Sequence, residues 1–150
     1  MASPGWSGEP PRRQDAKEAV VLREPDADVD GLAHAVTGAA IEVHRELGPG
    51  FLESVYEEAL AVELGLGGIP FVRPALVEVR YTGVRVGEGR LDLLVGRRLV
   101  VEVKAVDKLH PVHRAQVIAY LTAVGTPLGL LMNLTSAVLN DGIERITCCR

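Results

Sequence analysis

The segment RLDLLVGRRLVVEVKAV, residues 90–106, constrains the fold more than any other part of the chain. Two runs rich in Leu and Val flank a glycine and two arginines, a pattern that predicts a β-hairpin. The runs also contain three charged residues, Asp92 in the first and Glu102 and Lys104 in the second. Burying an unpaired charge costs roughly several kcal/mol, so these side chains must be paired, solvated or bound to a ligand.

The length of the hairpin loop decides whether the three charges meet. Glu102 and Lys104 are two residues apart, so their side chains leave the same face of the strand. A three-residue loop at 96–98 places Asp92 opposite Glu102 on that face. A two-residue loop instead pairs Asp92 with Val101 and puts the carboxylates on opposite faces. A shared site therefore requires an odd-numbered loop or a bulge. A structural explanation is also open, in which one carboxylate pairs with the lysine and the other is solvated at the strand end.

Helical and strand-like patterns continue on both sides of the hairpin. Apolar residues recur at steps of three and four in one segment and share a helical face in a second. Pro111 suits the first position of a third helix, and short Val- and Leu-rich runs bounded by glycines predict strands. The expected order is helix, helix, three strands, helix, strand, strand. The expected bounds are a helix from Asp28 or Asp30 to residue 47, helices at about 52–64 and 111–124, and strands at about 71–81, 90–95, 99–106, 128–134 and 142–148. Turns are expected at Thr82-Gly83 and Gly87-Glu88-Gly89.

The chain has 150 residues, of which 47% are hydrophobic, enough for one domain of helices packed on a sheet. Residues 1–28 are rich in Pro, Gly and charge and are expected to form a disordered tail, with residues 29–150 as the domain. No apolar run is long enough to span a bilayer and the N-terminus has no signal-peptide core, so the protein is expected to be cytoplasmic. Cys148 and Cys149 are expected to be reduced thiols. The net charge of −4 neither supports nor excludes a polyanionic substrate.

The segment after the first helix carries a recognisable signature. Gly50, Glu53 and Tyr56 match the G-x-x-E-x-x-Y pattern. The chain resembles the GxxExxY proteins, small prokaryotic proteins assigned to the PD-(D/E)xK nuclease superfamily. The similarity runs from about residue 32 to 146 and includes AAIEVHRELGPG, FLESVYEEAL, the D…ExK hairpin, LHPVHRAQVIAYL and GLLMN. The chain departs from the superfamily pattern at Leu91, where the proline before the first aspartate is missing. The resemblance implies a restriction-endonuclease-like three-layer α/β sandwich with a mixed central sheet and an αβββαβ core.

The same resemblance assigns roles to the hairpin residues. Asp92 and Glu102 would bind Mg²⁺, with Mn²⁺ as a substitute, because hard cations prefer carboxylate oxygens. The backbone carbonyl of Val103 would be a further ligand. Lys104 would orient the attacking water and stabilise negative charge on the phosphorus centre. The catalytic residues implied are therefore the two carboxylates and this lysine.

Residues outside the hairpin complete the expected site. The helix dipole alone explains Glu53 in a first turn, but in RecB-like relatives an acidic residue of this helix completes the metal site. Tyr56 is expected to be either a core aromatic or a substrate contact. His113 is expected on the surface or against a phosphate. Gln116 and Tyr120 match a Q-x-x-x-Y element and lie on one helical ridge facing the site, where they would hold the lysine or a substrate phosphate.

The implied function is a Mg²⁺-dependent nuclease that hydrolyses phosphodiester bonds of nucleic acid, with DNA favoured over RNA. Two alternatives keep the fold without turnover: a nucleic-acid-binding module and a protein-interaction scaffold. The short chain has no evident target-recognition domain, so specificity would come from a homo-oligomer, a protein partner or the structure of the DNA. No membrane partner is expected.

Overall fold

The computed structural model describes residues 27–147, so nearly all of the expected tail and the adjacent Cys148 and Cys149 lie outside it. The elements in chain order are α2 (Ala27–Leu47), α3 (Glu53–Leu66), β1 (Phe71–Val72), β2 (Ala75–Tyr81), β3 (Val84–Leu91), β4 (Leu93–Val95), β5 (Leu99–Lys104), α4 (Pro111–Val124), β6 (Leu128–Asn133), α5 (Leu139–Gly142) and β7 (Ile143–Thr147). None of the described helices is long and apolar enough to cross a membrane.

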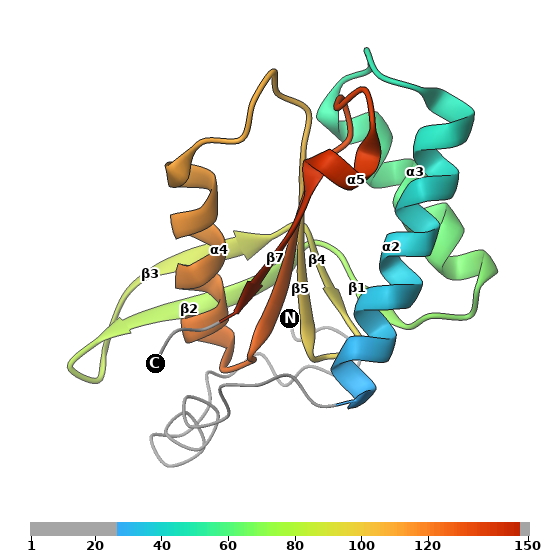
Figure 1. Cartoon of the computed structure of the whole chain (residues 1–150). Coiled ribbons are helices and arrows are strands. Elements are labelled where there is room, and N and C mark those ends of the chain that lie inside the picture. The colour runs from blue at the N-terminus through green and yellow to red at the C-terminus, as the bar shows by residue number, and fades with distance from the viewer. Residues whose placement is uncertain (1–26, 148–150) are drawn as a thin grey trace.

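Three layers make up the molecule, as expected. The central sheet has the strand order β1-β4-β5-β6-β7 and is mixed, because β5 and β6 pair in parallel while the other neighbours are antiparallel. Helices α2 and α3 cover one face of this sheet and α4 covers the other (Figure 1). Helix α4 connects the two parallel strands, since a parallel pair needs a long crossover.

Each face of the sheet has its own apolar cluster. Leu99, Val101 and Val103 of β5 pack with the cluster that includes α2 and α3. The alternate residue Val100 packs in the cluster that includes α4. Since side chains alternate along a strand, Glu102 and Lys104 also leave β5 on the α4 face.

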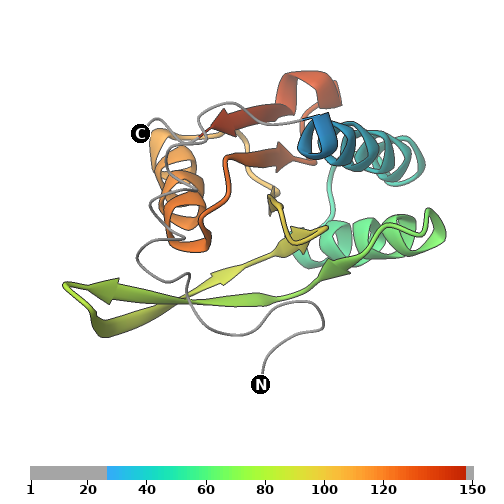
Figure 2. The ribbon, with the colours of Figure 1, turned by 90° about the horizontal axis from the view of Figure 1, so that it is seen from below.

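The expected strand at 71–81 is divided in two at Arg73-Pro74. The first part, β1, pairs with β4 of the central sheet, whereas β2 pairs with β3. Proline has no N–H with which to continue the hydrogen bonds of a strand, so the expected strand is interrupted at Pro74. Strands β2 and β3 form a separate two-stranded ribbon that extends away from the rest of the molecule (Figure 2).

The turn expected at Gly87-Glu88-Gly89 is wrong, because these residues lie inside β3 (Val84–Leu91). Gly89 instead allows two side chains to approach the backbone closely: an added Cβ would lie 3.0 Å from Tyr120 Cε1 and 3.0 Å from Val77 Cγ1. The short helix α5 was not expected, since four residues are too few to show a helical period.

Gly129 of β6 sets how closely α4 approaches the sheet. An added Cβ would lie 2.7 Å from Val117 Cγ1 and 3.3 Å from Leu121 Cδ2. Overpacking of a filled core typically costs about 1–3 kcal/mol, so Gly129→Ala is expected to lower the free energy of unfolding by about that amount in urea titrations. Gly38→Ala is the matched control, because its Cβ would meet nothing within 4 Å in α2. Equal midpoints for both variants would contradict the observed packing of α4.

Candidate active site

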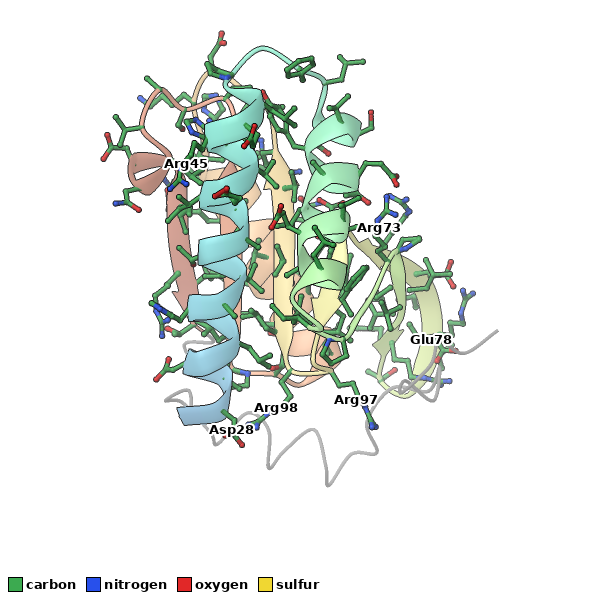
Figure 3. The ribbon with its side chains drawn as sticks, turned by 90° about the vertical axis from the view of Figure 1, so that its right-hand side faces the viewer. Asp28, Arg45, Arg73, Glu78, Arg97 and Arg98 are labelled. Carbon is green, nitrogen blue, oxygen red and sulfur yellow. The ribbon has the colours of Figure 1, made fainter. Side chains whose placement is uncertain are left out.

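The ends of several elements meet at one end of the sheet. The parallel strands β5 and β6 end there, and α3 and α4 begin there from opposite faces (Figure 1). Each helix N-terminus carries a partial positive charge, so this end of the molecule favours anions. The hairpin loop lies at the other end, where Arg98 approaches Asp28 at the start of α2, with 3.8 Å between Nη1 and Oδ2 (Figure 3).

The hairpin loop has the odd length that a shared site requires. Leu93 pairs with Val101 and Val95 pairs with Leu99, which leaves residues 96–98 in the loop. Gly96 and Arg97 both adopt positive φ, at 58° and 64°. This register places Asp92 opposite Glu102. Asp92 is the residue between β3 and β4.

Asp92 and Glu102 are held by each other's strand. The N–H of Asp92 donates to Glu102 Oε1 at 3.0 Å, and the N–H of Val103 donates to Asp92 Oδ2 at 2.8 Å. Both side chains are buried, with exposures of 7% for Asp92 and 3% for Glu102. Each carboxylate therefore accepts one backbone N–H, and the two side chains also interact with each other.

The two carboxylates repel each other in a poorly solvated setting. Burial first, then the charge of Asp92 and its side-chain hydrogen bond, together raise the pKa of Glu102 to about 8, against the lowering effects of the Asp92 N–H and of Lys104. A cation between two such groups would remove the repulsion.

Lys104 does not neutralise the pair directly. In the part of the chain that the structure describes, its Nζ forms no ion pair and donates instead to Gln116 Oε1 at 3.2 Å. Gln116 Nε2 in turn donates to the Tyr120 hydroxyl at 3.2 Å. Gln116 therefore contacts both Lys104 and Tyr120, and the arrangement differs from the ion-pair explanation of the hairpin charges.

Glu53 is the first residue of α3 and is partly buried. Burial and the charge of Asp92 raise its pKa, whereas the charge of Lys104 lowers it, so Glu53 lies within electrostatic reach of both. Sequence reasoning missed Glu57, one turn later, whose pKa is also raised by burial and then by Asp92. The four-residue spacing from Glu53 was the available signal.

Tyr56 and His113 have structural partners. Tyr56 is fully buried, so the substrate-contact alternative does not fit this structure, and it belongs to the apolar core. His113 Nδ1 accepts the N–H of His110 at 2.9 Å and so caps the start of α4. Burial, and then the positive charge of Lys104, lower the pKa of His113.

The donor set suits a small hard cation, although the ligands are not yet gathered around one point. Among residues 27–147, no group of three or more His, Cys, Asp or Glu side chains is close enough to hold an ion. The pair of Asp92 and Glu102 nevertheless supplies two buried carboxylates with no ion-pair partner in that range, and Mg²⁺ needs only one or two carboxylates beside water and substrate oxygens. The residues therefore fit such an ion.

These features agree with the family to which the chain belongs. A model of the PD-(D/E)XK nuclease superfamily matches residues 30–146, and the chain is a member of this superfamily. By sequence, the chain matches none of the curated proteins. Among solved structures, the alkaline exonuclease LHK-Exo from Laribacter hongkongensis is 15% identical, with a TM-score of 0.47 over 89% of this chain and 76% of the exonuclease. The crystal structure of SSO0001 is 17% identical, with a TM-score of 0.47 over 91% of this chain and 76% of the other.

The raised pKa of Glu102 predicts how stability depends on pH when metal is chelated. The folded state holds this proton more tightly than the unfolded state, in which the pKa is near 4.5. The stabilisation is therefore fully present below about pH 4.5 and is lost as the pH rises to about 8, a change on the order of a few kcal/mol. Glu102→Gln is expected to remove most of this slope in urea melts with EDTA. Glu53 and Glu57 contribute smaller slopes of the same sign. An unchanged slope in the variant would contradict the assignment to Glu102.

Proposed function

We propose that this protein is a Mg²⁺-dependent nuclease that hydrolyses phosphodiester bonds of DNA, with Mn²⁺ able to replace Mg²⁺. The observation that carries the proposal is the pair of buried carboxylates, Asp92 and Glu102, beside a lysine that forms an ion pair with neither of them. A merely structural charge cluster would be expected to pair Lys104 with one carboxylate. The residues at all four metal and lysine positions are present, which favours turnover over a catalytically silent module.

The ion would be held by Asp92, Glu102 and the carbonyl of Val103, with Glu53 approaching from α3. Each carboxylate has one oxygen that is not bonded to the backbone. When bound, the metal supplies Lewis acidity toward the phosphate and lowers the pKa of its water. The raised pKa of Glu102 favours the protonated form without metal, so metal binding would release a proton near neutral pH.

Lys104 would act on the attacking water. Its Nζ is anchored by Gln116 Oε1 and keeps further N–H groups with which to orient that water and to stabilise charge on the phosphate oxygens. The Tyr120 hydroxyl accepts the amide N–H of Gln116, which turns the amide oxygen toward the lysine. The N-termini of α3 and α4 would attract the phosphate to this end of the sheet.

The finer assignment rests on the sequence signature. We propose that the protein is one of the GxxExxY proteins, on Gly50, Glu53 and Tyr56 and on the Q-x-x-x-Y element of α4. DNA is favoured over RNA as the substrate. A second copy of the chain or a protein partner would contribute to specificity.

The test is a cleavage assay on single-stranded, duplex and branched DNA and on the matching RNAs. Mg²⁺ and Mn²⁺ are expected to support cleavage, and EDTA is expected to abolish it. In parallel, a metal that binds only the folded state should stabilise it by about 2.7 kcal/mol at a hundredfold excess over Kd. The proposal would be overturned in favour of a scaffold if the protein cleaves none of these substrates and millimolar Mg²⁺ and Mn²⁺ leave its melting temperature unchanged.

A further inference from the structure

The hydroxyl of Tyr56 joins the two sides of the turn between α2 and α3. It donates to the Gly48 carbonyl at 2.6 Å and accepts the N–H of Phe51 at 3.1 Å. The ring of Phe51 meets the Tyr56 ring edge-on, with centroids 6.1 Å apart. Tyr56 is itself fully buried, and both bonds are partly buried.

We propose that Tyr56 is a positioning residue for the nuclease site, whose hydroxyl fixes the turn at residues 48–51 and thereby aims Glu53 at Asp92 and Lys104. This inference rests on the proposed function. It also gives each residue of the signature a role, since Gly50 forms the turn, Glu53 supplies the charge and Tyr56 anchors both.

Within residues 27–147, no side chain other than Tyr56 makes a hydrogen bond to the backbone of the turn at residues 48–51. The N-cap residue, Leu52, makes no side-chain cap bond, so the usual device for fixing a helix start is missing. Gly50 has φ of 118°, a conformation that side-chain-bearing residues rarely adopt, so the backbone here depends on glycine and on external support. The Tyr56 hydroxyl therefore supplies the side-chain hydrogen bonds that hold this turn, beside the ring contact of Phe51 and the backbone bond from the Gly48 N–H to the His44 carbonyl.

Tyr56 also connects this turn to the end of β5. It belongs to the apolar cluster that contains Val103 and, at its border, Ala105, the residues on either side of Lys104. Glu53 lies one turn before Tyr56 on the same helical face. A shift of the turn would therefore move Glu53 relative to the lysine while leaving the core ring in place.

The test uses Tyr56→Phe, which removes the hydroxyl and keeps the ring. Amide exchange of Phe51 should accelerate in the metal-free protein, because its N–H loses its acceptor. The apparent affinity for Mg²⁺, measured by calorimetry and by the Mg²⁺ dependence of cleavage, should fall about tenfold, at the lower end of losses for residues that orient metal ligands. Glu53→Gln should lower the affinity at least as much, and the double variant should match Glu53→Gln alone.

Leu64→Val is the matched control. Leu64 is fully buried in the same helix and the same apolar cluster as Tyr56, but it lies near the C-terminal end of α3. This variant should lower the melting temperature and leave both the exchange of Phe51 and the Mg²⁺ affinity unchanged.

Three results would overturn the role of Tyr56: unchanged exchange at Phe51, losses that add in the double variant, or the same loss of Mg²⁺ affinity in Leu64→Val. A wild type that neither cleaves nor binds Mg²⁺ would instead overturn the proposed function. The two failures are thus distinguishable, because the first requires an active, metal-binding wild type.

Discussion

Asp92→Asn is expected to reduce cleavage by at least about 100-fold and to remove most of the rise in melting temperature that Mg²⁺ produces. The substitution takes away one of two carboxylate ligands, a larger change than the loss of an outer residue that merely orients a ligand. The amide oxygen of asparagine can still accept the N–H of Val103, so the hairpin contact survives. Above about pH 8, where both carboxyls of the wild type are ionised, relief of the repulsion with Glu102 should leave the metal-free variant as stable as the wild type or more so.

Asp107→Asn is the matched control, since Asp107 is an exposed acidic residue of the loop after β5. It should change neither the cleavage rate nor the Mg²⁺-induced shift. A metal-free Asp92→Asn protein that melts well below the wild type would show that the carboxylate stabilises the fold, as the scaffold alternative expects.

Lys104→Ala is expected to separate catalysis from metal binding. General acid–base and water-orienting groups typically contribute about 10²–10⁴-fold to a rate, so cleavage should fall within that range. The Mg²⁺-induced rise in melting temperature should persist, because Lys104 acts on the water and is not a ligand. Cleavage rates and thermal melts across a Mg²⁺ titration measure the two effects on one preparation.

Lys108→Ala, which removes an exposed lysine four residues later, should leave both quantities unchanged. The ion-pair alternative makes the opposite prediction for the two main variants. It expects Asp92→Asn and Lys104→Ala to destabilise the protein together, with no metal-dependent shift to lose.

Much of the fold could be predicted because its elements repeat a simple period. The apolar stripe of α2 and the Leu- and Val-rich strands β5 and β6 lie close to the expected bounds. The neighbouring sequence could not predict that the strand is divided at Arg73-Pro74 or that glycines lie inside β3. Whether Gly89 marks a turn or a close contact depends on Tyr120, which reaches it from a helix distant in sequence.

The parts of the candidate site that depend on the alternation of side chains along a strand could be predicted from the sequence. Glu102 and Lys104 share a face by spacing, and the loop at 96–98 brings Asp92 opposite Glu102. The bend at Asp92 was not predictable, because the expected single strand at 90–95 becomes the junction of two sheets. Nor did the sequence reveal that Tyr56 is wholly buried, since the same spacing suits a half-exposed aromatic.

Because Asp92 and Glu102 are hydrogen-bonded to backbone amides, those amides would respond to an ion bound at the site. Each carboxylate takes an N–H of the opposite strand, Asp92 N–H in one case and Val103 N–H in the other. An ion that draws an oxygen away from either amide would expose that proton to exchange and shift its resonance. Occupancy of the site would then be readable from two backbone signals without substrate, label or turnover.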